Sequence, residues 1–267
     1  MRQALTAAAA ATALVWTSGA ALAGPISPTL QFQAQESWQT SSTTTIKGKK
    51  TTVITDNSAS SGVVIDTTHT GRVEFSTTSG HSFGTFSSLS ATGLGDPLIG
   101  AGLDDEVDLS AQTSAGKLSN IVGGSVVLNL LLTETGLTTN LGTLPFEAAI
   151  GGTIGKGMVL TYKTYVDPAD HPFGESILLT NSASLSGSPF AWGGDVDKLL
   201  QGAFSMTEMV TISVPSSASA VGTSFDASLS TTAVPEPGTM MILGLPLTLI
   251  GVAVARRKAA LDHGSVG

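Results

Sequence analysis

The chain of 267 residues contains no cysteine. This absence excludes a disulfide framework, a zinc–thiolate site, an iron–sulfur cluster and a cysteine nucleophile. Basic residues are scarce, with 12 Lys and Arg against 20 Asp and Glu, and the formal net charge is −8. Because binding to phosphates needs clustered positive charge, we expect no nucleic acid among the partners. Aromatic residues make up only 5% of the chain, which is little for a carbohydrate-active enzyme.

Serine and threonine are abundant, 67 together, and 41% of the residues are hydrophobic. That hydrophobic fraction is close to the value for folded domains and disfavours disorder of the whole chain. Part of it is concentrated in two apolar segments, one near each end of the sequence. The region between them, residues 24–237, carries 19 acidic and 8 basic residues and has a net charge of −11.

The apolar segment near the N-terminus has the pattern of a signal peptide. An uncharged apolar run, residues 4–16, precedes the small residues Ala21 and Ala23. Small side chains two residues apart suit the pockets of signal peptidase, and Pro25 then keeps the cut site extended. We therefore expect residues 1–23 to be a signal peptide that signal peptidase removes after Ala23.

The apolar segment near the C-terminus has the features of a membrane-spanning helix. Residues 238–255 carry no charge, and their number is about the minimum for one crossing of a bilayer. The basic residues Arg256, Arg257 and Lys258 follow at once and indicate the cytoplasmic side. The sequence predicts a helix with an Arg/Lys stop at residues 238–258 and a short cytoplasmic tail at residues 259–267.

A proline-rich motif stands directly before this span and consists of Val234, Pro235, Glu236, Pro237 and Gly238. The two prolines fix their own φ angles and extend the residues before them, so the motif forms a stiff stalk with one carboxylate. Motif, apolar span and basic triplet together resemble the PEP-CTERM sorting signal of bacterial exported proteins. The resemblance covers about residues 234–258, and a plain membrane anchor with an incidental Pro-Glu-Pro is the alternative.

The resemblance implies a destination and a processing enzyme. It implies export across the inner membrane of a Gram-negative cell and recognition of Pro235, Glu236 and Pro237 by an exosortase, a membrane-embedded cysteine transpeptidase. The chain would be held transiently in the inner membrane, cut near the motif and released to the cell surface or extracellular matrix. Hosts of this kind usually make an exopolysaccharide, which is therefore an expected associate.

The region between the two end segments has the patterning of β-strands. Alternation with period two, typical of strands with one buried and one wet face, occurs at residues 30–34, 72–76 and 209–214. Residues 43–46 and 51–55 flank a glycine-containing turn, as in a β-hairpin. More apolar runs, such as residues 124–133, fit strands buried on both faces.

This pattern predicts an all-β fold, a jelly-roll-like β-sandwich at residues 24–227. A Ser/Thr/Pro linker at residues 228–237 would join it to the span, and residues 195–201 would form a brief helical turn. A β-helix or solenoid is the alternative fold, although the sequence has no repeat of fixed period.

One motif suggests catalysis. Gly80 to Gly84, with Ser82 at the centre, matches the G-x-S-x-G nucleophile elbow of α/β-hydrolases. That elbow needs a strand before the serine and a helix after it, whereas residues 85–90 alternate with period two and are poor helix formers. We therefore expect no enzymatic activity, and a secreted serine hydrolase using Ser82 is the less favoured alternative.

Metal and ligand sites have little support in the sequence. The histidines, which lack any metal-binding spacing, are His69, His81, His171 and His263. Two acidic groups, residues 104–108 and the pair Asp195 and Asp197, contain the oxygen ligands that Ca²⁺ takes, but a solvated surface is the favoured interpretation. We expect no metal and no cofactor. The alternative function is a carbohydrate-binding, ice-binding or adhesive module. Its binding could also depend on Ca²⁺.

Overall fold

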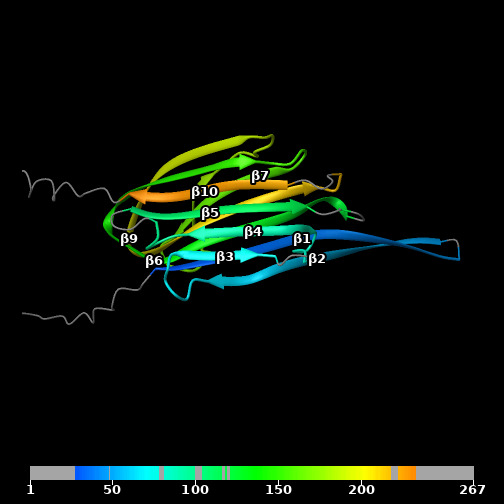
Figure 1. Ribbon diagram of the computed structural model, residues 1–267, viewed down its shortest axis with the longest axis horizontal. Helices are drawn as coiled ribbons and strands as arrows, with labels where there is room; N and C mark the ends of the chain where they lie inside the picture. Colours follow the sequence, from blue (N-terminus) through cyan, green and yellow to red (C-terminus); the bar gives the residue numbers. More distant parts are fainter. Residues whose placement is uncertain are drawn as a thin grey trace, which may run out of the picture.

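The computed structural model describes residues 28–47, 49–77, 81–99, 104–115, 118, 121–217 and 222–232, and over these residues the chain contains no helix. The strands are β1 (Thr29–Ile46), β2 (Lys49–Ile65), β3 (Arg72–Ser76), β4 (Phe86–Leu94), β5 (Asp104–Ala115), β6 (Ile121–Thr153), β7 (Val159–Asp167), β8 (Ile177–Asn181), β9 (Phe190–Pro215) and β10 (Gly222–Thr232). All of them belong to one sheet with antiparallel pairing (Figure 1).

Two long strands organise this sheet. Residues 121–135 of β6 pair with β1, whereas residues 146–153 of the same strand pair with β10. β9 follows β6 along its other edge, and their register shifts between Glu134 and Leu137 and again between Thr139 and Gly142. Extra residues at such shifts bend a pair of strands. The β6–β9 pair therefore passes from one half of the sheet into the other.

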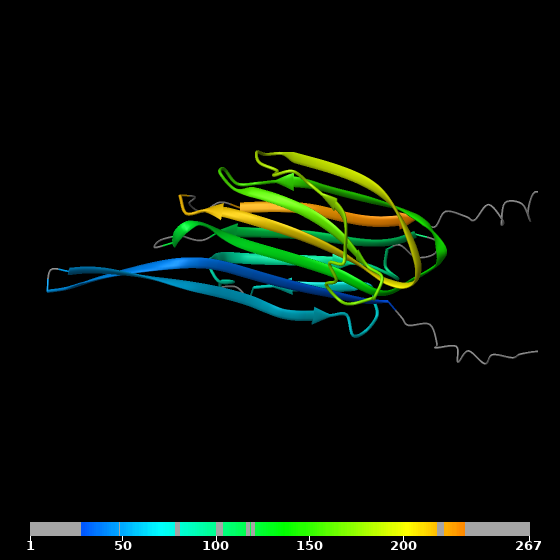
Figure 2. The ribbon, with the colours of Figure 1, turned by 180° about the vertical axis from the view of Figure 1, so that it is seen from behind.

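The bend turns the sheet back on itself, so that two layers face each other (Figure 2). Layer one has the order β2-β1-β6-β9-β7-β8, and layer two has the order β3-β4-β5-β10-β6-β9, with different parts of β6 and β9 in each. This arrangement confirms the predicted all-β sandwich as a sheet curled almost to closure. The antiparallel pairing throughout contradicts the β-helix alternative.

One hydrophobic core fills the space between the layers. Along β9 the inward side chains Val210, Ile212 and Val214 are fully buried, and the residues between them are partly exposed. The layers pack closely where Gly93 of β4 faces Leu132 of β6, since a Cβ atom on Gly93 would lie 2.3 Å from Leu132 Cδ1. Close packing of this kind stabilises the fold by about 1.5–3 kcal/mol for each large buried side chain.

The β1–β2 hairpin extends beyond the two layers (Figure 1). Its register, with Ile46 opposite Lys49, confirms the predicted hairpin and makes its connection two residues shorter than the four residues, 47–50, between the predicted strands. β1 pairs with β6 only as far as Thr40, so within the described part of the chain residues 41–54 pair only with each other. We call residues 41–54 the hairpin arm.

Two details differ from the sequence-based expectations. Residues 195–201 do not form a helical turn, because they alternate in burial and continue β9 beside β6. β10 runs to Thr232 and so takes in the first five residues of the predicted linker 228–237. The Ser/Thr composition suggested a linker there, but Leu229 and Thr231 are buried at period two between β5 and β6.

Candidate functional site

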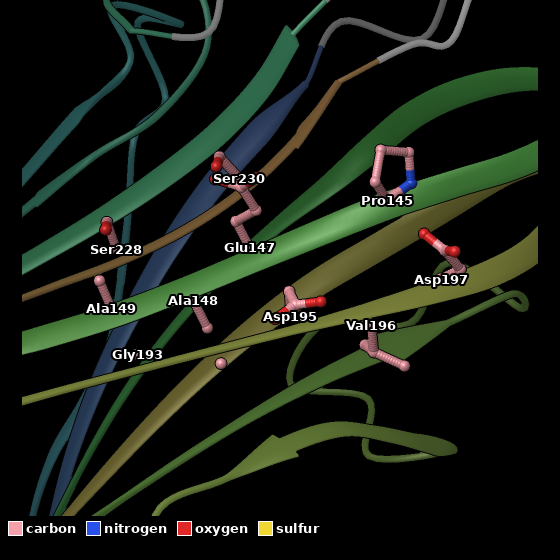
Figure 3. A pocket seen from close by; sticks show the side chains of 11 residues that line it. Pro145, Glu147, Ala148, Ala149, Gly193, Asp195, Val196, Asp197, Ser228 and Ser230 are labelled. Atoms are coloured by element: carbon pink, nitrogen blue, oxygen red, sulfur yellow. The ribbon is translucent and has the colours of Figure 1, made fainter.

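An open groove of about 410 Å³ crosses the outer face of layer two (Figure 3). Three neighbouring strands line it: β10 supplies Ser228 and Ser230, β6 supplies Pro145, Glu147, Ala148 and Ala149, and β9 supplies Gly193, Gly194, Asp195, Val196 and Asp197. The floor is low where Ala149 lies opposite Gly193, because neither has a large side chain. The groove thus combines small residues, two hydroxyl groups and three carboxylates.

The carboxylates of the groove lie close to one another. Glu147 is directly opposite Asp195 across the β6–β9 pair, and Asp197 is two residues further along β9. Directly opposite side chains in an antiparallel pair have Cβ atoms about 4.5–5.5 Å apart, and like charges at such positions destabilise the pair. A positively charged group bound here would relieve this repulsion.

The negative charge continues across the sheet onto β5. Asp108 lies opposite Ser228 and Glu106 lies opposite Ser230. Burial, followed by the nearby Asp226 and Glu106, raises the pKa of Asp108 to about 6. We call the outward carboxylates of layer two the acidic face: Glu106, Asp108, Glu147, Asp195, Asp197 and Asp226.

The acidic run at residues 104–108 therefore does not act as one cluster. It belongs to a strand, and side chains along a strand point alternately to opposite faces. Val107 is fully buried, so Glu106 and Asp108 point outward while Asp105 faces the interior. Among the described residues, no group of three His, Asp or Glu side chains is placed to hold a metal ion.

Two of the described histidines, His69 and His171, have local contacts. His171 Nδ1 lies 2.9 Å from Asp167 Oδ2, and His69 Nδ1 lies 3.1 Å from the carbonyl oxygen of Pro28. His81 is exposed and is itself part of the G-x-S-x-G motif, and His263 lies outside the described residues.

The G-x-S-x-G motif leads into a strand. Phe83 and Phe86 exchange backbone hydrogen bonds in a tight turn, and β4 begins at Phe86. Gly84 of the motif lies against the Glu36 side chain of β1, which accepts a hydrogen bond of 2.9 Å from the backbone N–H of the next residue, Thr85. A strand after the serine does not provide the helix that a nucleophile elbow requires.

The sequence reasoning missed a buried acid on β9. Glu208 is fully buried and forms a short hydrogen bond with the hydroxyl group of Tyr162, which also donates to the carbonyl oxygen of Ser228 at 2.9 Å. One phenolic proton cannot serve both acceptors. Burial raises the pKa of Glu208 well above its usual range, so a protonated Glu208 resolves the conflict. The available signal was the position of Glu208 at period two between Met206 and Val210.

A second buried acid lies where the β6–β9 pair bends. Glu134 is fully buried and accepts a hydrogen bond of 2.9 Å from the backbone N–H of Asp96. Burial, reinforced by the carboxylates of Asp96 and Asp105, raises the pKa of Glu134 to about 8. Glu134 Oε2 and Asp96 Oδ1 are buried without a hydrogen-bond partner among the described residues.

The predicted sorting residues lie outside the described part of the chain. This holds for the cleavage-site residues Ala21 and Ala23, for the PEP motif Val234, Pro235, Glu236, Pro237 and Gly238, and for the stop residues Arg256, Arg257 and Lys258. Within the described residues, no helix is long and apolar enough to cross a membrane.

The described residues define an all-β domain with an acidic outer face, positioned in the sequence between two predicted targeting segments. The family model of the PEP-CTERM protein-sorting motif matches residues 233–258. The chain therefore carries a PEP-CTERM sorting motif, as the resemblance indicated. The motif implies an exported protein, anchored in the membrane during sorting and processed by an exosortase.

The sequence has no significant match among curated proteins. The solved structures similar to the fold include TmCBM61 in complex with beta-1,4-galactotriose, with 11% identity, a TM-score of 0.25 and coverage of 52% of this chain and 86% of that one. The K3 cleaved adhesin domain of Lys-gingipain from Porphyromonas gingivalis has 9% identity, a TM-score of 0.26 and coverages of 46% and 74%. A structure of infectious bursal disease virus, Gx strain, has 12% identity, a TM-score of 0.30 and coverages of 78% and 57%. Similarities of this extent carry no functional information for this chain.

Proposed function

We propose that this chain is a non-enzymatic protein of the cell surface or extracellular matrix, delivered there by its C-terminal sorting signal. The observation that supports this most directly is the PEP-CTERM motif at residues 233–258, which follows a β domain that ends at Thr232. In this proposal the β domain is the delivered product, and the two end segments serve only its delivery.

The proposed route has three steps. Signal peptidase cuts after Ala23, the apolar segment at residues 238–258 holds the precursor in the inner membrane, and an exosortase cuts near Pro235, Glu236 and Pro237. The released domain then reaches the surface or the matrix. Its freedom from cysteine fits this route, because an oxidising compartment cannot cross-link it wrongly and its stability rests on the β core.

The destination that we favour is an exopolysaccharide-containing matrix. The outer face of the domain offers hydroxyl groups and carboxylates in an open groove, and both kinds of group form hydrogen bonds with sugar hydroxyl groups. A Ca²⁺-dependent adhesive module is less well supported, since the described residues contain no group of ligands placed to hold a metal.

Processing is tested by the intact mass of the exported protein. In a host with an active exosortase, we expect a species that starts at Gly24 and has lost residues 238–267. Glu236→Ala should cause accumulation of the uncut precursor in the membrane, whereas Glu175→Ala, a change of an exposed glutamate in the β domain, should leave processing unchanged. Full-length protein at the surface, or normal processing of Glu236→Ala, contradicts the proposal.

The destination and the lack of catalysis need separate tests. Deletion of exopolysaccharide synthesis in the host should move the protein from the matrix into the medium, and an unchanged distribution contradicts the matrix assignment. A fluorophosphonate probe should not label the exported protein. Labelling that disappears in Ser82→Ala would instead identify a serine hydrolase.

A further inference from the structure

The hairpin arm is a surface without a partner inside the described domain. Residues 42–45 and 49–54 are exposed on both faces, including Val53 at 55% and Ile54 at 61%. Six residue pairs, from Ser41 opposite Ile54 to Ile46 opposite Lys49, extend it by about 20 Å. An isolated two-stranded hairpin is only marginally stable in water, so an arm of this length gains stability when another surface covers it.

The tip of the arm carries a concentration of positive charge. Lys47, Lys49 and Lys50 are all exposed there, and they are three of the eight basic residues between positions 24 and 237. The first acidic residue along β2 is Asp56, which lies beyond the arm and accepts a hydrogen bond of 2.8 Å from Gln39. The positively charged tip of the arm thus projects from a domain that carries the acidic face on layer two.

The groove that would suit this tip lies toward the opposite end of the domain. Asp197 and Pro145 line the groove beside the bend of the β6–β9 pair, and β10 ends nearby at Thr232. The arm extends from the other end of the long axis (Figure 1). An arm cannot reach the groove of its own chain, so contact between these two surfaces requires two molecules.

We propose that the tip of the hairpin arm binds in the acidic groove of a second copy of this chain. The lysines would lie among Glu147, Asp195 and Asp197 and relieve the repulsion between the opposed carboxylates of Glu147 and Asp195.

The geometry of this contact determines the form of the assembly. The arm and the groove are different surfaces at opposite ends of the domain, so the contact is heterologous. The domains therefore associate head to tail, into open chains where the rotation between neighbours does not close and into rings where it does. This inference concerns the assembly of the domain and does not depend on how the chain is sorted.

The first test uses the protein purified as its host exports it. The weight-average mass from sedimentation should rise at least about twofold above that of a monomer as the protein concentration increases. It should return to the monomer value in about 1 M salt, where the Debye length falls to about 3 Å. A mass that stays monomeric at all concentrations, or an association that salt does not weaken, overturns the proposal.

The second test reverses the charge of each surface. An arm variant, Lys47→Glu with Lys49→Glu and Lys50→Glu, should be monomeric, and so should a groove variant, Glu147→Lys with Asp195→Lys and Asp197→Lys. A mixture of the two variants should associate, because the acidic arm of one now matches the basic groove of the other. Association of either variant alone, or a mixture that stays monomeric, contradicts a specific arm–groove contact.

Two controls separate this result from misfolding and from net charge. Far-UV circular dichroism and the melting temperature should show that both variants keep the β fold, and the recovery of association in the mixture requires that both are folded. A control with Lys156→Glu and Lys163→Glu changes lysines away from the arm and should associate like the native protein. Loss of association in this control would show that net charge alone governs it and would overturn the proposal.

Discussion

The hairpin arm and the two-layered body of the domain are built from similar residues but have different surroundings. Both are rich in Thr, Val and Ile, which favour strands. In the body each strand turns one side toward a shared core, whereas the arm exposes both sides of its strands. Strand propensity therefore explains where strands form, and burial explains which of them hold the domain together.

The sharpest test of this comparison truncates one aliphatic side chain in each region. Leu132→Ala in β6 removes a fully buried side chain between the layers and should lower the free energy of unfolding by about 3–5 kcal/mol. Ile54→Ala in the arm removes an exposed one and should change it by less than about 0.5 kcal/mol. Urea denaturation of both variants, followed by tryptophan fluorescence, measures the two values. A similar loss in both variants would mean that the arm is part of the cooperative core.

The two regions also differ in how they hold ionisable groups, since the body buries Glu134 while the arm exposes its lysines. The folded-state pKa of Glu134, about 8, lies above the ordinary 4.5, so the folded protein keeps a proton that the unfolded chain loses between these values. The proton retained by Glu134 thus stabilises the folded state. This stabilisation is complete below pH 4.5 and falls by about 1 kcal/mol per pH unit as the pH rises to 8.

Glu134→Gln, which keeps an acceptor oxygen for the N–H of Asp96, should remove this pH dependence. Its stability relative to the native protein should increase by about 3 kcal/mol between pH 5 and pH 8. Denaturation at several pH values measures the difference, and Glu74→Gln, a change of an exposed side chain, serves as the control. Parallel pH profiles for the native protein and Glu134→Gln would mean that Glu134 is ionised in the folded state.

The close approach of the layers gives a smaller but more local test. Gly93→Ala places a methyl group 2.3 Å from Leu132 Cδ1, and the shift this forces should destabilise the fold by about 1–2 kcal/mol. Gly151→Ala in β6 meets its nearest atom at 3.6 Å and should change stability much less. Thermal denaturation compares the two variants. Equal effects would show that strand propensity, and not the contact between layers, limits the size of residue 93.

The sequence predicted those parts of the fold that depend on local pattern. The hairpin around residues 47–48 and the period-two strands were found because alternation and turn residues are local signals. The bend of the β6–β9 pair was not found, because it depends on register shifts between strands about 70 residues apart. The buried Glu134 and Glu208 were missed for a related reason, since their hydrogen-bond partners, the N–H of Asp96 and the hydroxyl group of Tyr162, come from segments distant in sequence.

The candidate site shows the same division. The pair Asp195 and Asp197 was singled out by composition alone, and its placement opposite Glu147 follows only from the register of β9 on β6. The run at residues 104–108 was interpreted as one acidic group, yet alternation along β5 divides it between two faces. Composition thus identified the acidic residues, whereas the pairing of the strands determines on which face of the sheet each carboxylate lies.

The smallest expected effect concerns Glu147 and Asp195, the opposed carboxylates of the groove. In the arm the corresponding pair of directly opposite residues is Thr43 and Thr52, whose hydroxyl groups are joined by a hydrogen bond of 3.1 Å. Like charges directly opposite destabilise an antiparallel pair, so Asp195→Asn should raise the free energy of unfolding by about 0.5 kcal/mol at low ionic strength. Salt screens exposed charges, and the gain should disappear in about 1 M salt. Dilute protein must be used, because the proposed arm–groove contact would otherwise stabilise the native protein and hide the gain. Thr43→Val is the control, because Thr43 and Thr52 are uncharged and its effect on the free energy of unfolding should not depend on salt. A salt-dependent effect of Thr43→Val would mean that the charge of the lysines at the arm tip influences stability along the whole arm.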